Sequence, residues 1–217
     1  MKARVDAIIQ REQAEYLDSL LTNNDPLLAE MEKYAAKHHV PIADREVARF
    51  LEITARTTQA RKALEIGMAI GYSVVHLARG MGERGLVVTI EPNEEMISAA
   101  SGYLDRANLM DQVKIERGKA LDVMPGIEDN FDLLYIDAVK EEYKQYLDLG
   151  IPMLRPGGVI IVDNLLWGGK VAVENAANDG DASTVALREF NAYFVNHPRL
   201  LAEVLPIGDG LGYAVKE

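Results

Sequence analysis

From residue 62 onward, short apolar runs alternate with stretches of helical spacing, and this alternation limits the possible folds more than any other feature. Such an order is typical of a parallel sheet covered by helices on both faces. The last two runs are separated by a four-residue turn, which predicts an antiparallel hairpin at the sheet edge. The predicted strands are 62–66, 86–90, 113–117, 131–136, 158–163, 200–206 and 211–216, and the helical stretches are 72–81, 94–108, 140–150 and 183–196.

The first 60 residues are expected to be helical instead. Pro26 suits the first turn of a helix that runs towards His38, and Asp44 is expected to cap the next helix. We therefore expect one domain over residues 1–217, with a helical extension (1–60) before an α/β core (61–217). The apolar face of the first helix is predicted to comprise Val5, Ile8, Ile9, Tyr16, Leu17, Leu20 and Leu21.

Composition excludes several classes of protein. Hydrophobic residues make up 48% of the 217 residues, which is enough for a core, and the absence of cysteine excludes disulfides and thiolate metal sites. No apolar run approaches the ~20 residues of a membrane helix, and the start is charged too early for a secretory signal, so a cytoplasmic protein is expected. The formal net charge of −11 disfavours binding to nucleic acid, which is also negatively charged. The first 62 residues are charge-balanced, however, so an RNA partner would have to approach there.

The loop after the first predicted strand is expected to border a ligand pocket, because ligands bind beyond the carboxyl ends of strands in open α/β sheets. Gly67 and Gly71 allow close backbone approach, and Glu91 ends the next strand, where a carboxylate can bind both ribose hydroxyls. The G-x-x-x-G spacing differs from the dinucleotide fingerprint G-x-G-x-x-G, which disfavours a nicotinamide oxidoreductase and suits a nucleoside without phosphates, such as S-adenosylmethionine. Glycines and a strand-end glutamate are also ordinary turn residues.

Three oxygen-bearing side chains follow two further predicted strands. Asp137 ends one strand, and Asp163 and Asn164 end its predicted neighbour, so they can converge on a hard cation such as Mg²⁺. Each is also a common turn former or helix cap. Lys140 lies three residues after Asp137, and a cation beside it would favour the neutral amine that a general base requires.

Taken together, the motifs resemble the metal-dependent class I O-methyltransferases, which include catechol and caffeoyl-coenzyme A O-methyltransferases. The resemblance implies a Rossmann-like methyltransferase fold: a mostly parallel seven-stranded sheet with a reversed last strand. It further implies S-adenosylmethionine as donor and a divalent cation, with magnesium the expected ion. A homodimer is also expected. The matching motifs are LEIGMAIGYS (64–73), Glu91, YIDAVKEEY (135–143), LRPGGVIIVDNLLWGG (154–169) and GDGLGYAV (208–215).

The resemblance also assigns roles to individual residues. It implies that Lys140 is the catalytic base and that Asp137, Asp163 and Asn164 bind the metal. The donor-binding residues that it implies are Glu65, Gly67, Gly71, Tyr72, Ser73, Glu91, Lys119, Ala120 and Asp137.

Several positions depart from the catechol enzymes. Gly212 stands where they carry a glutamate that holds the second substrate hydroxyl, Val139 replaces a tryptophan before the base, and Lys119 replaces an aspartate of many bacterial relatives. The acceptor is therefore expected to be either a small aromatic with adjacent hydroxyls or, as in a similar bacterial branch, the wobble 5-hydroxyuridine of tRNA. Both present two adjacent oxygens to a metal. A non-catalytic binding module is a third alternative, and residues 167–183 are expected to form a lid over the acceptor.

Overall fold

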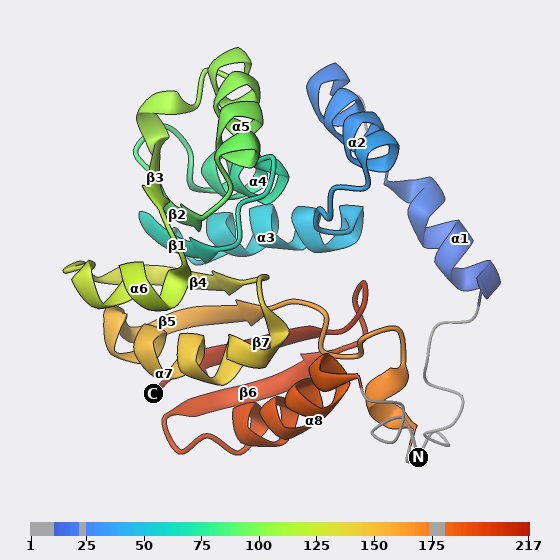
Figure 1. The fold of residues 1–217 in the computed structure, drawn as a ribbon, viewed down its shortest axis with the longest axis vertical. Helices are drawn as coiled ribbons and strands as arrows, with labels where there is room; N and C mark the ends of the chain where they lie inside the picture. Colours follow the sequence, from blue (N-terminus) through green and yellow to red (C-terminus); the bar gives the residue numbers. More distant parts are fainter. Residues whose placement is uncertain (1–10, 22–24, 174–180) are drawn as a thin grey trace.

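A computed structural model of the chain describes residues 11–21, 25–173 and 181–217. Within these residues, seven strands form one sheet in the order β3-β2-β1-β4-β5-β7-β6 (Figure 1). β7 runs antiparallel to both of its neighbours, and every other pairing is parallel. The strands are β1 (Lys62–Ile66), β2 (Leu86–Glu91), β3 (Val113–Arg117), β4 (Phe131–Ile136), β5 (Leu154–Val162), β6 (Leu200–Leu205) and β7 (Leu211–Lys216).

The sheet confirms the predicted fold class. All seven expected strands are present, the last strand is reversed, and β6 and β7 form the expected antiparallel hairpin at one edge. The main difference is that β5 begins at Leu154 rather than at residue 158, where the apolar run starts. Leu154 is buried and pairs with Phe131 before an irregularity in the register, so the strand begins at this residue although Arg155, Pro156 and Gly157 separate it from the apolar run.

Helices cover both faces of the sheet (Figure 1). One face is covered by α3 (Arg45–Thr57), α4 (Tyr72–Met81) and α5 (Glu94–Arg106), and the other by the short α6 (Ala120–Val123), α7 (Tyr143–Met153) and α8 (Ala182–Val195). Short 3-10 helices occupy η2 (Met110–Gln112), η3 (Met124–Gly126), η4 (Lys140–Glu142) and η5 (Lys170–Ala172).

The sheet separates two hydrophobic cores. Successive side chains of a strand point to opposite faces, so Ala63 packs beneath α3–α5 whereas Leu64 and Ile66 pack beneath α6–α8. Nearly every side chain of β1 and β2 is buried, as expected for strands covered on both faces. The two cores hold the strands in place, and the strand ends therefore form a fixed platform for the loops that follow them.

Within the described residues, the N-terminal segment is helical, as predicted. α2 (Pro26–His38) begins with Pro26 in its first turn, and Asp25 caps it by accepting a hydrogen bond from the Leu27 amide (2.8 Å). Asp44 does precede α3, but its side chain makes no capping hydrogen bond within the described residues, which corrects the expected role. α1 (Arg11–Leu20) lies apart from the sheet in Figure 1. Of its predicted apolar face, Tyr16, Leu17 and Leu20 are exposed, whereas Val5, Ile8 and Ile9 lie outside the described residues.

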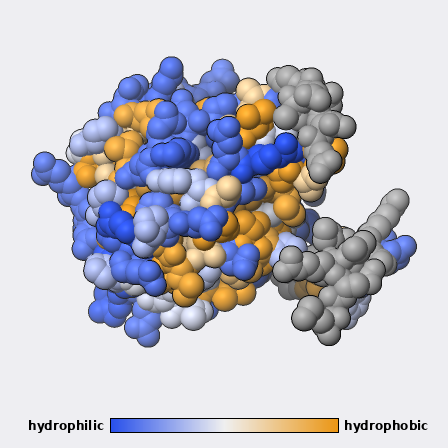
Figure 2. All heavy atoms as spheres, turned by 90° about the horizontal axis from the view of Figure 1, so that it is seen from below, coloured by the Kyte–Doolittle hydropathy of each residue, from blue (hydrophilic) through white to orange (hydrophobic). Residues whose placement is uncertain are grey.

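Apolar residues also reach the surface beyond α1. The face seen from below in Figure 2 mixes hydrophilic and hydrophobic residues, and the exposed apolar residues of β6 and α8 include Leu201, Val185 and Val195. Scattered apolar residues of this kind are normal on protein surfaces. Among the helices that the structure describes, none is long and apolar enough to cross a membrane.

Candidate functional site

The carboxyl ends of β1, β2, β4 and β5 meet at one edge of the sheet, and a cavity of about 790 Å³ opens there. From β1 the strand order runs to β2 on one side and to β4 on the other, and such a switch point is where open α/β sheets bind ligands. The cavity gathers most of the predicted donor-binding residues: Gly67, Tyr72, Ser73, Glu91, Lys119, Ala120 and Asp137.

The backbone conformation of the loop between β1 and α4 lets the loop lie close to the end of β4. Gly67 has φ +97°, and a Cβ there would come within 2.0 Å of the backbone oxygen of Asp137, so the loop passes closer to β4 than any side chain would allow. Ala69 also has a positive φ (+47°), which is unfavourable for a residue with a side chain. The loop is therefore strained and needs contacts that hold it.

Glu91 supplies one of these contacts at the end of β2. Its side chain is buried, with Oε2 accepting from the Ala69 amide (3.0 Å) and Oε1 accepting from the Asn93 amide (2.9 Å). Each carboxylate oxygen keeps a further acceptor site, because it has two lone pairs. Glu91 can thus fix the loop and accept hydrogen bonds from a hydroxylated ligand in the cavity at the same time.

Two of the predicted donor-binding residues do not line the cavity. Glu65 is fully buried on the face beneath α4, where the Thr89 hydroxyl donates to its Oε2 (2.5 Å) and its Oε1 has no partner among the described residues. Burial raises the pKa of Glu65 to about 7, although nearby hydroxyls oppose the shift. Gly71 begins α4 with a left-handed φ (+83°) and packs against Ala100. Their predicted part in donor binding stays a prediction.

The oxygen-bearing residues at the ends of β4 and β5 converge on one point. The ammonium of Lys140 donates to Asp137 Oδ1 (2.8 Å), to Asn164 Oδ1 (2.6 Å) and to the Tyr143 hydroxyl (2.7 Å). Lys140 is mostly buried, and Asn164 has φ +64°, a strained conformation that turns it towards the cluster. Lys140 is thus a positive charge held by the same oxygens that were predicted to bind a metal.

Asp163 lies behind this point and does not line the cavity. It is 2% exposed, with Oδ1 accepting from the Asn164 amide (2.7 Å) and Oδ2 accepting from the Tyr135 hydroxyl (3.0 Å). Burial raises its pKa to about 7, and the negative charge of Asp137 adds to the rise. A buried acid of this kind is stabilised as a carboxylate by a cation nearby.

This set of side chains fits a hard divalent cation. Two carboxylates and one amide offer only oxygen ligands, which is the donor chemistry that Mg²⁺ and Ca²⁺ prefer. Such cations take about six to eight oxygen ligands, so three protein side chains would fill only part of the coordination shell. Water or a ligand with oxygen atoms would have to complete it.

Negative charge surrounds one side of the cavity. Asp44 directly follows Ala43, which lines the cavity. The Asp44 carboxylate lies against Gly208, where an added Cβ would be 3.1 Å from one of its oxygens. Partial burial raises the pKa of Asp44, and the nearby carboxylates of Glu46, Asp209 and Asp137 raise it further. Phosphate groups are therefore disfavoured on this side.

The predicted lid contacts the cavity from both of its described ends. Trp167 lines the cavity, and its indole nitrogen donates to Asp181 (3.2 Å), while the Ser183 hydroxyl donates to Glu141 (2.6 Å). Lys170 also binds Asp181 (3.0 Å). Residues 174–180, the middle of the predicted lid, lie outside the described residues, so its motion stays a prediction.

Packing explains why position 212 holds a glycine where the catechol enzymes carry a glutamate. This residue lies in β7, where a Cβ would come within 2.7 Å of Leu165 Cδ1 and 3.0 Å of Phe194 Cε1. The backbone therefore has no room for a glutamate at this position.

Sequence reasoning missed two groups of residues at the site. Pro41, Ile42 and Ala43 line the cavity although they belong to the N-terminal segment. Tyr143 contacts Lys140 and donates to the Asp163 carbonyl (3.2 Å), and its spacing of three residues from Lys140 could have indicated a shared helical face. No spacing pattern in the sequence indicates that residues 41–43 belong to the site, because only tertiary packing brings them to the sheet edge.

Comparison with known proteins places this geometry in context. A family model described as O-methyltransferase matches residues 18–217. The chain is similar to a catechol O-methyltransferase of Mycobacterium tuberculosis, with 37% identity over 193 residues that cover 88% of this chain and 86% of that protein. It is also similar to a catechol O-methyltransferase of Niastella koreensis, with 31% identity over 92% of this chain and 94% of that protein.

A solved structure extends the similarity to the fold. The O-methyltransferase from Bacillus cereus, crystallised in complex with S-adenosylhomocysteine, is 32% identical to this chain and superposes with a TM-score of 0.83. The alignment covers 94% of this chain and 96% of that structure. S-adenosylhomocysteine is what remains of S-adenosylmethionine once its methyl group has been transferred.

Proposed function

Because this chain belongs to the O-methyltransferase family and is an S-adenosylmethionine-dependent O-methyltransferase, we propose that it methylates one of two adjacent oxygens on a small, catechol-like aromatic with the help of a divalent cation. One observation carries the proposal. Oxygens of Asp137 and Asn164 converge on a single positive charge, the ammonium of Lys140, at the edge of the cavity that also holds Glu91.

The donor is assigned to the part of the cavity nearest β1 and β2. In this proposal Glu91 accepts hydrogen bonds from the ribose hydroxyls, the loop from Gly67 to Ser73 holds the methionine end, and Lys119 and Ala120 border the adenine. The loop is shaped for close approach by Gly67, and Glu91 already holds it through the Ala69 amide. Glu65 supports the loop from beneath rather than through contact with the cavity.

The cation is assigned to Asp137, Asp163 and Asn164. When bound, it would supply a fixed positive charge that lowers the pKa of an acceptor hydroxyl. Magnesium is our proposal, because the donor set consists of oxygens alone.

Lys140 is the proposed general base. Its Nζ lies among Asp137, Asn164 and the Tyr143 hydroxyl at the cavity wall. In its neutral form, the amine could accept the proton of an acceptor hydroxyl that lies at the same place. The acceptor oxygen then attacks the sulfonium methyl in line with the departing sulfur. Trp167 and the N-terminal residues 41–43 would orient an aromatic acceptor and exclude water.

The acceptor is proposed to be a small aromatic rather than tRNA. The relatives described above are named for catechols. Carboxylates of Glu141 and Glu142 line the cavity, Asp44 lies beside it, and the chain carries a formal charge of −11, all of which oppose a polyphosphate acceptor. Methylation of 5-hydroxyuridine in tRNA remains a prediction without support from these relatives. Family membership favours methyl transfer over a nicotinamide oxidoreductase or a binding module.

Three further expectations belong to the proposal. Residues 1–217 work as one methyltransferase domain, the protein forms a homodimer, and it acts in the cytoplasm. Each rests on the sequence pattern or on resemblance to the family.

Labelled methyl transfer tests the proposal. The protein is incubated with S-adenosylmethionine, magnesium and either catechol or phenol, which lacks the second oxygen, and a parallel reaction contains tRNA. We expect labelled product from catechol, none from phenol, and loss of the product in excess EDTA. Full activity in excess EDTA would rule out the metal role, and labelling of tRNA in preference to catechol would reverse the choice of acceptor.

A further inference from the structure

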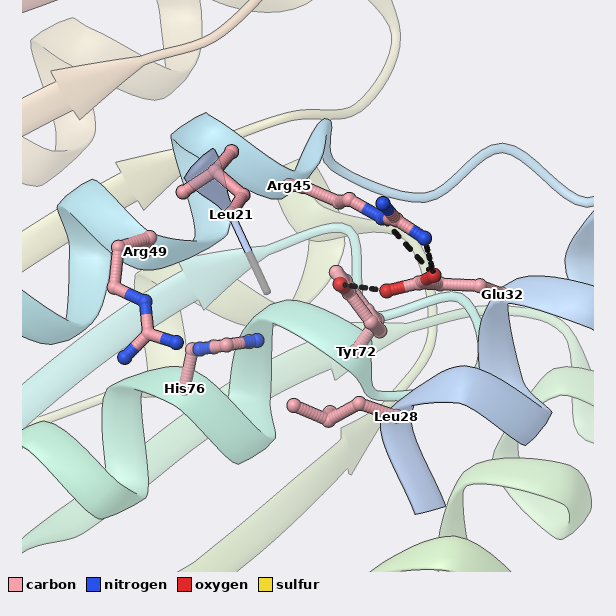
Figure 3. Close-up of a pocket in the computed structure, with 7 residues that line it drawn as sticks. All are labelled: Leu21, Leu28, Glu32, Arg45, Arg49, Tyr72 and His76. Atoms are coloured by element: carbon pink, nitrogen blue, oxygen red, sulfur yellow. Dashed lines mark hydrogen bonds and ion pairs between the residues drawn. The ribbon is translucent and has the colours of Figure 1, made fainter. Parts of the chain in front are cut away.

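A second, much smaller cavity lies between α2, α3 and α4 (Figure 3). Its volume is about 20 Å³, enough for about one water molecule, and its walls include Glu32, Arg45, Tyr72 and His76. His76 is 4% exposed, and its Nε2 atom has no hydrogen-bond partner among the described residues, whereas its Nδ1 lies 2.9 Å from a Glu52 oxygen. Its remaining walls are Leu21, Leu28 and Arg49, so charged and apolar side chains both border this small space.

A chain of hydrogen bonds crosses this cavity from the N-terminal helices to α4. The Tyr72 hydroxyl donates to Glu32 Oε1 (2.7 Å), and Glu32 Oε2 accepts from Arg45 Nη2 (2.6 Å) and Nε (3.0 Å), as Figure 3 shows. Glu32 belongs to α2, Arg45 is the first residue of α3, and Tyr72 is the first residue of α4. Three helices therefore meet at one carboxylate.

Both donors in this chain of bonds keep their protons at neutral pH. Burial raises the pKa of Tyr72, and its hydrogen bond to Glu32 raises it further, so the hydroxyl remains a donor at neutral pH. The hydrogen bond to Glu32 also raises the pKa of Arg45, which stays charged. A hydrogen bond to a charged acceptor is among the stronger ones in proteins.

Tyr72 is the residue that connects the two cavities. It lines both the small cavity and the large one, and it directly follows the strained loop from Gly67 to Gly71. The Gly67 amide donates to the Ile90 carbonyl (3.1 Å), and Glu91 accepts from the Ala69 amide, so the start and the middle of the loop are tied to β2. At its end, the Gly71 amide donates only within the loop, to the Met68 carbonyl (2.9 Å). The Tyr72 hydroxyl, held by Glu32, ties the end of the loop to α2.

We propose that Glu32 is a positioning residue for the donor site: through Tyr72 it holds the end of the donor loop and the first turn of α4 in the conformation that binds S-adenosylmethionine. The inference rests on the proposed use of the large cavity by this donor. It makes donor affinity depend on α2, a helix that contributes no residue to the large cavity.

The test compares variants of Glu32 with a matched variant of the same helix. Glu32→Ala removes the acceptor, whereas Glu32→Gln removes the charge but keeps an oxygen that can accept from Tyr72. Glu30→Ala is the control, because Glu30 lies on α2 in an exposed ion pair with Arg106 (2.6 Å) and outside both cavities. Dissociation constants for S-adenosylmethionine are measured by calorimetry, and melting temperatures are measured on the same samples.

Glu32→Ala is expected to weaken donor binding by about fivefold to thirtyfold, because a hydrogen bond to a charged group is lost. Tyr72→Phe is expected to weaken it similarly, and the double variant to weaken it no further than either one alone, since both changes remove the same bond. Glu32→Gln is expected to restore most of the affinity, and Glu30→Ala to leave it unaltered. In steady-state assays the loss in Glu32→Ala should appear in the KM for the donor, with little change in kcat.

A purely structural role would give a different pattern. If Glu32→Ala and Tyr72→Phe lower the melting temperature but bind the donor as tightly as the wild-type protein, the inference is overturned. Additive losses in the double variant would overturn it as well. A wild-type protein that binds no S-adenosylmethionine would instead contradict the proposed function, so the two failures are distinguishable.

Discussion

The close approach of Gly67 to Asp137 allows a quantitative prediction. An alanine Cβ at position 67 would lie 2.0 Å from the Asp137 backbone oxygen, far inside ordinary contact, and the backbone φ of +97° is unfavourable for any residue but glycine. Conformational strain of this kind costs about 1–2 kcal/mol, and forcing extra atoms into a packed site costs about 1–3 kcal/mol more. Gly67→Ala should therefore lower the free energy of unfolding by about 2–5 kcal/mol.

Two other glycines separate these contributions. Gly82 has a positive φ (+71°), but a Cβ there would meet nothing within 4 Å, so Gly82→Ala measures strain without overlap. Gly102 lies inside α5 with neither feature, and Gly102→Ala should stabilise the protein by about 0.5–1 kcal/mol through helix propensity. The predicted order of stability is therefore Gly102→Ala, wild type, Gly82→Ala and then Gly67→Ala.

Urea denaturation followed by circular dichroism measures this series. For a chain of this length, 1 kcal/mol corresponds to about 2–4 °C in Tm, so thermal melting provides a second measurement. Gly67→Ala should also lose metal-dependent methyl transfer, because its Cβ displaces the backbone of a proposed metal ligand. If Gly67→Ala is no less stable than Gly82→Ala, the overlap with Asp137 is relieved without cost and the reasoning fails.

The remaining predictions concern the charged groups of the site. Asp163→Ala should abolish magnesium-dependent methyl transfer while donor affinity, measured by calorimetry, stays close to the wild-type value; retained transfer would contradict the metal assignment. Lys140→Ala should lower kcat by about 10²–10⁴-fold, the usual contribution of a general base, with little change in donor affinity, and an unchanged kcat would remove that role. Burial raises the pKa of Glu65 to about 7 from a usual 4.5, so the folded state holds a proton that the unfolded state releases, and Glu65 costs stability as pH rises between these values. Glu65→Gln should therefore stabilise the protein more at pH 8 than at pH 5 in urea denaturation, and an equal effect at both values would show that Glu65 does not titrate in this range.

Local sequence patterns predicted those site residues whose positions are set by the residues next to them in the chain. Gly67 and Asp137 directly follow β1 and β4. Glu91 is the last residue of β2, and Asn164 lies two residues beyond β5. The position of a strand end can be read from the apolar run that precedes it. Parallel strands place their carboxyl ends at one edge, so these residues were expected to meet.

Other features depended on distances along the chain that no local pattern encodes. The partner of the Tyr72 hydroxyl is Glu32, forty residues earlier, and the cap expected from Asp44 is not made although the residue lies at the predicted position. Glu65 is buried because helices cover both faces of β1, and the motif to which it belongs does not reveal that its side chain points into the core and not into the cavity.

The sequence by itself determined the strands, the sheet edge at which a ligand is expected and the chemical types of the side chains there, because apolar periodicity and turn residues act over a few positions. Only the tertiary structure decided that Lys140 lies among Asp137, Asn164 and Tyr143, and that α2 reaches the donor loop through Tyr72. The physical reason is that the packing of helices on the two faces of the sheet sets these distances, and that packing depends on the whole chain at once.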